Sequence, residues 1–416
     1  MNDSDSSSSH SFRLLGKRNF ALLWIGAVVS ASGFYVGNVV IEWFIYASSH
    51  DALYLTILGV IEFVPILSIG IIAGALVDRH DRRHLMIASD LARAATLGAL
   101  AAYVLILGFN LPVILILMFA IAAFGTVFNP SSGAILPSLL NKDDLPDGNG
   151  LLEAGTTAAG FIGSPLGGAL ILVVGVGGGL IYNSATFAIS ALMIALITIP
   201  VALNRKPEDS ESEKGSLLSD VKAGFRFLRE QRALLTLTLA SMVLNFFTFY
   251  LLYVVVFVSN VLHAGPAVFG LVVGVQSAGY AVGALLLVGR LKMGRRPGVW
   301  IPVAWGLSGL PLIIMILIPL VPIAMVCAVT MGVLSALVNI TFVSTVQKIV
   351  PDEFLGRYFA IDQAGGYSMI PAGLVVGGLL IVTVGVGVAF VLAGAGTLVI
   401  GLGLLLSSSV RSWGRP

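Results

Sequence analysis

Apolar runs that are long enough to cross a lipid bilayer recur along most of this chain of 416 residues. A membrane-spanning helix needs about 20 consecutive apolar residues. Twelve runs meet this length, at residues 20–47, 53–76, 85–108, 112–138, 148–174, 177–203, 233–262, 266–289, 298–318, 321–347, 357–384 and 386–409. Only 11% of the residues are charged, against about 25% in a soluble domain. The sequence therefore predicts an all-α integral membrane protein with twelve transmembrane helices.

Basic residues mark alternate ends of these runs and so indicate the orientation. Arg13, Lys17 and Arg18 precede the first run, whereas loops such as 48–51 and 175–179 contain no Lys or Arg. Loops rich in Lys and Arg stay on the cytoplasmic side of the membrane. We therefore expect a multi-pass protein of the cell membrane with both termini in the cytoplasm.

The longest polar stretch lies between the sixth and seventh runs. Its second half has Leu217, Val221, Phe225 and Leu228 at helical spacing, which predicts an amphipathic helix on the membrane surface. The expected domains are a disordered cytoplasmic tail (1–11), an N-terminal six-helix bundle (12–203), a cytoplasmic linker (204–231), a C-terminal six-helix bundle (232–409) and a cytoplasmic tail (410–416).

The two halves also resemble each other in sequence. Glu153-Ala154-Gly155 matches Gln363-Ala364-Gly365, and Gly167-Gly168 matches Gly377-Gly378 with the same offset of 363 − 153 = 210. A second match, 81–83 with 294–296, is displaced by three further residues. Because transporters are commonly built from repeated bundles with the substrate path between them, the pattern predicts two six-helix pseudo-repeats.

Ionisable groups inside the membrane are few, and each costs about 2.5 to 3.5 kcal/mol at mid-depth on insertion scales. Glu62 lies near the middle of the second run, and Glu42 lies in the outer half of the first, on one helical stripe with Tyr35 and Asn38. We expect these four residues to act in proton coupling or substrate binding. The alternative for both glutamates is a protonated carboxyl group that is hydrogen-bonded within the bundle.

Other polar residues lie on the runs that are expected to line a central path. The candidates for the cavity are Asn245, Thr248, Tyr250, Gln276 and Asn339. Aromatic side chains with a few hydrogen-bonding groups suit a large, mostly apolar solute, although an aromatic run can also face lipid or pack in a core. Asp90 and Arg93 are three residues apart on one helix and are expected to form an ion pair.

One charged segment between the second and third runs carries a family resemblance. Gly74-x-Leu76-x-Asp78-Arg79-x-Asp81-Arg82-Arg83 resembles the motif between helices 2 and 3 of the major facilitator superfamily, with Asp81 where many members have glycine. Shorter segments, Phe12-Arg13 to Trp24, Asn129-Pro130 to Pro137 and Gly224 to Leu228, resemble the third drug:proton antiporter family. Macrolide exporters and the enterobactin exporter belong to that group.

The resemblance implies the major facilitator fold and a cytoplasmic gate. The gate residues are expected to be Gly74, Asp78, Arg79, Arg82 and Arg83, with Arg357 and Asp362 near the inner end of the eleventh helix. The alternative for the arginines is that they only anchor the topology.

The antiporter motif of the fifth helix is present in altered form. Gly163, Gly167 and Gly168 keep the spacing, but Ala159 replaces one glycine and Pro165 is displaced by one residue. Small residues at this spacing let two helices approach closely, so simple packing is as good an interpretation as a role in antiport.

The resemblance further implies a secondary active transporter that exports lipophilic drugs or secreted metabolites by alternating access, in exchange for protons. The alternatives are an importer or lipid transporter of the same fold, and a non-transporting membrane receptor or assembly factor. Expected partners are a small lipophilic substrate, protons and membrane lipids, with no nucleic acid, and we expect a monomer because one chain contains both repeats. The histidines lack metal-ligand spacing and there is no phosphate-binding loop, so no enzyme activity, metal or cofactor is expected.

Overall fold

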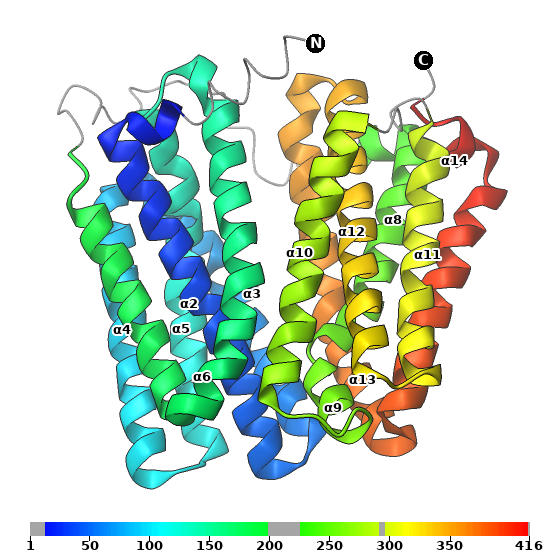
Figure 1. Ribbon diagram of the computed structural model, residues 1–416. Coiled ribbons are helices and arrows are strands. Elements are labelled where there is room, and N and C mark those ends of the chain that lie inside the picture. The colour runs from blue at the N-terminus through cyan, green and yellow to red at the C-terminus, as the bar shows by residue number, and fades with distance from the viewer. Residues whose placement is uncertain (1–12, 199–224, 291–295, 415–416) are drawn as a thin grey trace. The chain divides into compact units, whose positions relative to one another are not determined.

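The computed structural model describes residues 13–198, 225–290 and 296–414, and no strand occurs among them (Figure 1). The predicted tail at residues 1–11 and most of the predicted linker, residues 204–224, lie outside the described residues. The long helices are α2 (Arg18–Ser49), α3 (Ala52–Arg79), α4 (Arg82–Leu107), α5 (Leu111–Ile135), α6 (Leu145–Ala195), α8 (Arg232–Phe246), α10 (Pro266–Arg290), α11 (Pro297–Leu317), α12 (Val321–Ile349) and α13 (Asp352–Gly403).

Shorter elements extend or connect these helices. They are the 3-10 turns η1 (Leu14–Gly16), η2 (Leu136–Ser138), η3 (Lys142–Asp144), η5 (Phe247–Leu251) and η7 (Leu404–Leu406), and the helices α9 (Val254–Asn260) and α14 (Ser408–Ser412). Helix α8 continues through η5 into α9, and together they form one apolar segment of 29 residues, Arg232–Asn260.

Ten helices in the described part of the chain are long and apolar enough to cross a membrane. Two of them, α6 and α13, have 51 and 52 residues and each contains one glycine with a positive φ, Gly175 (73°) and Gly385 (86°). Glycine adopts this conformation readily because it lacks a Cβ atom. Both breaks fall where the sequence predicts the end of one span and the start of the next. Dividing α6 and α13 there is consistent with twelve spans.

The backbone also repeats with the offsets that the sequence predicts. Gly175 and Gly385 are separated by 385 − 175 = 210 residues. His50 and His263, the two non-glycine residues with positive φ in the described part of the chain, are separated by 263 − 50 = 213 residues. These differences equal the two offsets found in the sequence, so the repeat extends to turn geometry.

The chain divides into two compact units. The first holds the described residues within Met1–His50, Ile57–Glu208 and Pro266–Gly274, and the second holds those within Asp51–Thr56, Asp209–Gly265 and Val275–Pro416. The units differ from the bundles expected at 12–203 and 232–409 in the first turns of α3 and α10. Residues 51–56 belong to the second unit, and residues 266–274 belong to the first.

The first unit is held together by close contact between α2 and the first half of α6. A Cβ atom on Gly163 would lie 2.7 Å from the carbonyl oxygen of Ser32 and 3.1 Å from the Cβ of Tyr35. On Gly167 it would lie 3.0 Å from the carbonyl oxygen of Val36. The altered glycine motif therefore provides close helix packing within this unit.

In the second unit, the C-terminal segment packs into a hydrophobic core. Val410 in α14 is fully buried and Trp413 is 7% exposed, in a cluster with residues of α8, α11, α12 and α13. The Trp413 ring lies 6.0 Å from that of Phe342, and the Trp413 carbonyl accepts a hydrogen bond from the Gly298 N–H at 3.3 Å. The first part of the expected tail, up to Gly414, is thus a packed part of the unit.

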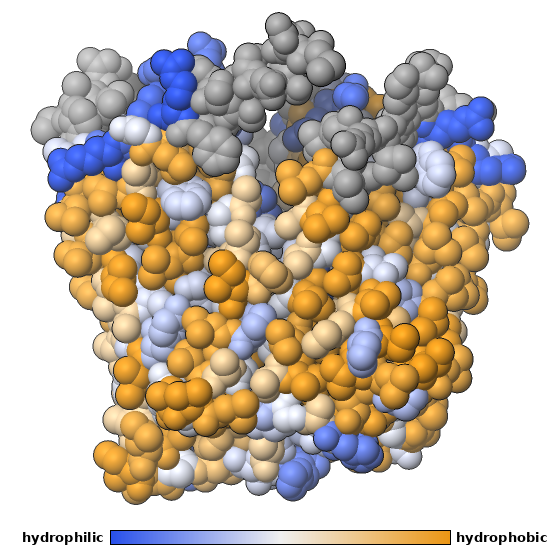
Figure 2. All heavy atoms as spheres, viewed as in Figure 1, coloured by the Kyte–Doolittle hydropathy of each residue, from blue (hydrophilic) through white to orange (hydrophobic). Residues whose placement is uncertain are grey.

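The surface has the hydropathy pattern of a membrane protein. On the face shown in Figure 2, hydrophobic residues cover the sides of the helices and hydrophilic residues gather near the helix ends. Large apolar side chains such as Val173, Leu285 and Leu317 are more than 70% exposed. Because such residues are unfavourable in water, these surfaces suit a lipid environment.

Candidate functional site

A cavity of about 600 Å³ lies within the first unit. Its wall is mostly apolar and aromatic, and polar groups are few, which is the composition of a small-molecule site. The polar and aromatic lining residues are Ser30, Phe34, Tyr35, Asn38, Glu62, Phe63, Arg93, Thr126, Phe128, Asn129, Ser132, Thr156, Asn183 and Phe187. These residues come from α2, α3, α4, α5 and both halves of α6.

Three of the four residues predicted for coupling line this cavity together. Tyr35 and Asn38 lie on α2, and Glu62 lies on α3, three residues before the helix-internal Pro65. Glu42 is not among the lining residues, but its carboxyl group is close enough to Glu62 to interact electrostatically. The structure therefore places an acidic pair at this cavity, with one member on its wall.

Neither glutamate has an ion pair or a hydrogen bond among the residues that the structure describes. The alternative interpretation, a carboxyl group that is hydrogen-bonded within the bundle, lacks such a partner for Glu62. A carboxyl group without a fixed partner on a cavity wall is free to bind a proton or a cationic ligand.

Arg93 is the lining residue whose place the sequence did not indicate. The predicted ion pair is confirmed, because Nη2 of Arg93 donates a hydrogen bond to Oδ1 of Asp90, one turn earlier on α4. The Arg93 Cζ atom also lies 4.3 Å from the ring centroid of Phe128 and 4.3 Å from that of Phe187. Arg93 is 8% exposed and Asp90 is 0% exposed. Sequence spacing finds the partner one turn away, but not the two rings, which lie on α5 and α6.

A second cavity, of about 560 Å³, lies within the second unit. It brings together Asn245 of α8 and Asp362 of α13, which the sequence assigned to the substrate path and to the gate. Asp362 Oδ1 accepts a hydrogen bond of 3.3 Å from the Ser241 hydroxyl. The two predicted roles therefore meet at one place in this unit.

The remaining cavity candidates do not line this second cavity. The Thr248 hydroxyl donates to the Asn245 carbonyl in its own helix at 2.7 Å. Tyr250 forms a side-chain hydrogen bond with Gln276, and Asn339 is exposed on α12. A shared binding surface for Thr248, Tyr250, Gln276 and Asn339 stays a prediction.

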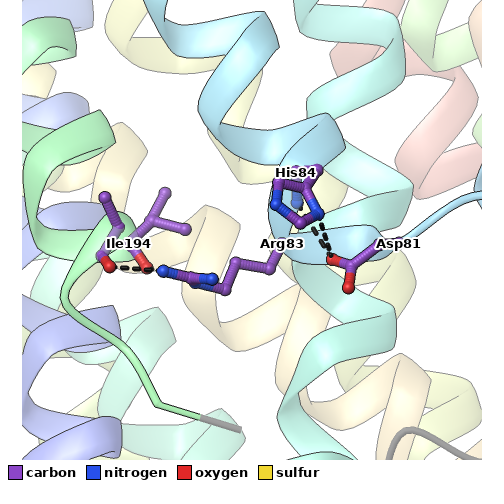
Figure 3. Close-up of polar contacts among 5 residues, drawn as sticks. Asp81, Arg83, His84 and Ile194 are labelled. Atoms are coloured by element: carbon purple, nitrogen blue, oxygen red, sulfur yellow. Dashed lines mark hydrogen bonds and ion pairs between the residues drawn. The ribbon is translucent and has the colours of Figure 1, made fainter.

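The charged segment between α3 and α4 ties three helices of the first unit together. Asp81 caps α4, since its side chain accepts a hydrogen bond of 3.0 Å from the His84 N–H. Arg82 Nη1 donates to the Ala134 carbonyl of α5 at 2.9 Å. Arg83 donates from Nε to the Ile194 carbonyl of α6 at 3.1 Å and from Nη2 to the Ala195 carbonyl (Figure 3).

Both acceptor groups lie at helix C-termini, where several carbonyls lack helical partners and the helix dipole favours a cation. Arg82 and Arg83 thus close the ends of α5 and α6 within their own unit. Arg82 and Arg83 therefore have partners within the first unit, and their role in a gate stays a prediction.

The other predicted gate residues lie on α3 and α13. The Asp78 side chain lies outside the described residues, and Arg79 is exposed at the end of α3. A Cβ atom on Gly74 would meet nothing within 4 Å. The Arg357 guanidinium lies 5.8 Å from the ring centroid of Phe354, one turn earlier in α13. The gate stays a prediction.

Comparison with known proteins extends these observations. A family model described as transmembrane secretion effector matches residues 9–415. Macrolide efflux protein A of Streptococcus pyogenes is 27% identical over 391 residues, which cover 91% of this chain and 93% of that protein. The multidrug efflux pump Tap of Mycobacterium tuberculosis is 26% identical over 371 residues, which cover 86% of each chain.

Among solved structures, the nucleoside transporter NupG superposes with a TM-score of 0.70 at 13% sequence identity. The match covers 93% of this chain and 98% of NupG. At this identity the likeness shows the fold alone.

Proposed function

Because this chain belongs to the transmembrane secretion effector family, a group of major facilitator superfamily transporters, we propose that it exports lipophilic compounds by alternating access, in exchange for protons. Family membership makes it a multi-pass membrane transporter of small substrates and not an enzyme. Export, proton exchange, the cell membrane, cytoplasmic termini and a monomeric state are parts of the proposal.

The cavity of the first unit carries this proposal. Glu62 offers an ionisable carboxyl group without a fixed partner on an aromatic wall, beside Tyr35 and Asn38. A carboxyl group in such a place can hold either a proton or the cationic group of a substrate, but not both at once. Because the proton and the substrate exclude each other, the transport of one is coupled to the transport of the other. Glu42, which interacts electrostatically with Glu62, contributes to the same exchange. The efflux relatives named above support export as the direction.

The cytoplasmic gate belongs to the same proposal. Asp78 and Arg79 act in opening and closing, with Gly74, Arg357 and Asp362 as further gate residues. Arg82 and Arg83 support the gate by holding α5 and α6 in place, since their hydrogen bonds stay within the first unit.

The experiment has two steps. A drug and metabolite susceptibility screen of cells with and without the protein identifies a substrate. The purified protein is then placed in liposomes that contain a pH indicator, and substrate is added. Substrate-dependent proton movement supports the antiporter. Movement of substrate without protons indicates facilitated or lipid transport, and no movement of any compound indicates a receptor or assembly factor.

Matched variants connect the result to the site. Glu62→Gln and Glu42→Gln remove one ionisable group each with little change in shape. Glu230→Gln makes the same change at an exposed position outside the cavity. We expect proton movement to be abolished in Glu62→Gln, weakened in Glu42→Gln and unchanged in Glu230→Gln. If Glu62→Gln and Glu42→Gln both keep full proton-linked transport, the assignment of the coupling residues is wrong.

A further inference from the structure

The guanidinium group of Arg93 contacts two aromatic rings at the cavity of the first unit. The ring centroids of Phe128 and Phe187 each lie 4.3 Å from Cζ, and both rings line the cavity with Arg93. Aromatic faces attract a cation but accept no strong hydrogen bond in the plane of its N–H groups. The in-plane N–H groups are therefore the part of Arg93 that can bind a polar partner.

Those N–H groups are only partly used. A guanidinium has about five N–H donors, and Nη2 with Asp90 makes the one hydrogen bond recorded for Arg93 within the described residues. Nε of Arg93 and Oδ2 of Asp90 are both buried without a partner, so Nε is closed to a ligand in the cavity. Nη1 also has no acceptor in the described part of the chain, but it is not among the buried atoms. Because Nη1 carries a charged donor group without an acceptor, a ligand that brings an acceptor to it gains a charge-assisted hydrogen bond.

The charges around the cavity narrow the chemistry of that acceptor. The positive charge of Arg93 is already balanced by Asp90. A second anion at Arg93 would leave an uncompensated negative charge in an apolar wall, which is costly. Glu62, on the same cavity, has no cationic partner among the described residues. The site therefore suits one positive charge at Glu62 and a neutral oxygen at Arg93.

We propose that Arg93 is a specificity-determining residue that donates a hydrogen bond to a neutral carbonyl, ester or ether oxygen of the transported molecule. The preferred substrate is then a lipophilic amine that also carries such an oxygen, and zwitterions are disfavoured. This inference rests on the proposed function in that the cavity must be the substrate site. It adds a second recognition point on α4, opposite in chemistry to the glutamate on α3.

The test measures equilibrium binding, so that it does not depend on transport. Three probes of equal length are titrated into the purified protein in detergent micelles. They are an aryl-alkyl tertiary amine, its analogue with one ester group, and its analogue with one carboxylate. A hydrogen bond to a charged group contributes about 1.5 to 3 kcal/mol, so we expect the wild-type protein to bind the ester about tenfold or more tightly than the plain amine.

For each variant we compare the affinity for the ester probe with the affinity for the plain amine. Their ratio is the readout, because a general loss of binding lowers both affinities alike. Arg93→Met combined with Asp90→Asn removes both charges together, leaves no buried unpaired ion and removes every N–H donor from the side chain at position 93. Arg93→Lys keeps the charge opposite Asp90 but lacks the planar donor group, and serves if the double variant does not fold. Arg226→Gln, at an exposed position, is the control. The ester preference should fall to about unity in the double variant, decrease in Arg93→Lys, and persist in the control.

Several results would overturn the inference. These are a wild-type protein with no ester preference, an ester preference that survives both Arg93 changes, a carboxylate probe that binds as tightly as the ester, and a wild-type protein that binds none of the probes. The proposed function fails separately. Probes that show the Arg93-dependent preference without proton-linked transport would refute proton exchange and leave the inference standing. Proton-linked transport with no effect of the Arg93 variants on the affinity ratio would refute the inference about Arg93 and leave proton exchange standing.

Discussion

The contact between α2 and α6 allows a quantitative prediction for Gly163. In Gly163→Ala the new methyl group would lie 2.7 Å from the Ser32 carbonyl oxygen and 3.1 Å from the Tyr35 Cβ. Backbone cannot rotate away as a flexible side chain can, so the two helices must separate. Overpacking of this kind costs about 1 to 3 kcal/mol. Replacement of glycine by alanine inside a helix by itself stabilises the folded state by about 0.5 to 1 kcal/mol.

Gly150 provides a matched control on the same helix. A Cβ atom there meets nothing within 4 Å. Gly150→Ala therefore shows only the gain in stability from replacing glycine by alanine in a helix. We expect Gly150→Ala to be slightly more stable than the wild type, and Gly163→Ala to be less stable than Gly150→Ala by the overpacking cost of about 1 to 3 kcal/mol. Reversible unfolding in mixed detergent micelles, followed by tryptophan fluorescence, measures both. Equal stability of the two variants would refute the close contact of α2 with α6.

The remaining predictions concern the helix ends and the C-terminal segment, and each is measured by the same unfolding assay. Asp81→Ala should lose about 1 kcal/mol by removing the cap of α4, whereas Asp81→Gly should lose only a few tenths, and an equal loss in both would contradict the capping role. Arg83→Gln should lose about 1.5 to 3 kcal/mol by removing a charged donor from the end of α6, and unchanged stability would show that the hydrogen bonds to Ile194 and Ala195 contribute nothing. Trp413→Ala should lose about 3 to 5 kcal/mol because Trp413 is buried, whereas Trp300→Ala, at a residue that is 44% exposed, should lose much less.

The fold was largely predictable because a membrane imposes simple rules. Length and apolarity mark the spans, and glycine marks the places where the chain must turn. Gly175 and Gly385 have positive φ at the predicted breaks, where a kink separates two helices that follow each other directly. The repeat offset was likewise visible in the sequence, because the same turn chemistry recurs in both halves.

The candidate site was predictable only in part. Glu62 was found because a carboxyl group in an apolar run is costly and therefore conspicuous, and the helical stripe of Tyr35 and Asn38 led to the same cavity. Arg93 was assigned a partner one turn away, since helical spacing fixes that distance. Its contact with two phenylalanine rings depends on how three separate helices pack.

The charged segment shows the same limit. The sequence predicted that Asp81, Arg82 and Arg83 lie in the turn between two helices. In the structure Asp81 caps α4, and Arg82 and Arg83 are the first two residues of that helix. It did not predict that the arginines reach carbonyls at the ends of α5 and α6. An unsatisfied helix terminus has no residue signature of its own, so the partner of a basic side chain there emerges only from the fold.

Gradient-driven transport tests the central claim most directly. Liposomes that contain the wild-type protein, Glu62→Gln or Glu230→Gln are given a pH gradient, and the accumulation of an identified substrate is measured beside its exchange without a gradient. We predict that the wild-type and Glu230→Gln proteins accumulate substrate, whereas Glu62→Gln exchanges substrate but accumulates none. Accumulation by Glu62→Gln at the wild-type level would contradict the account.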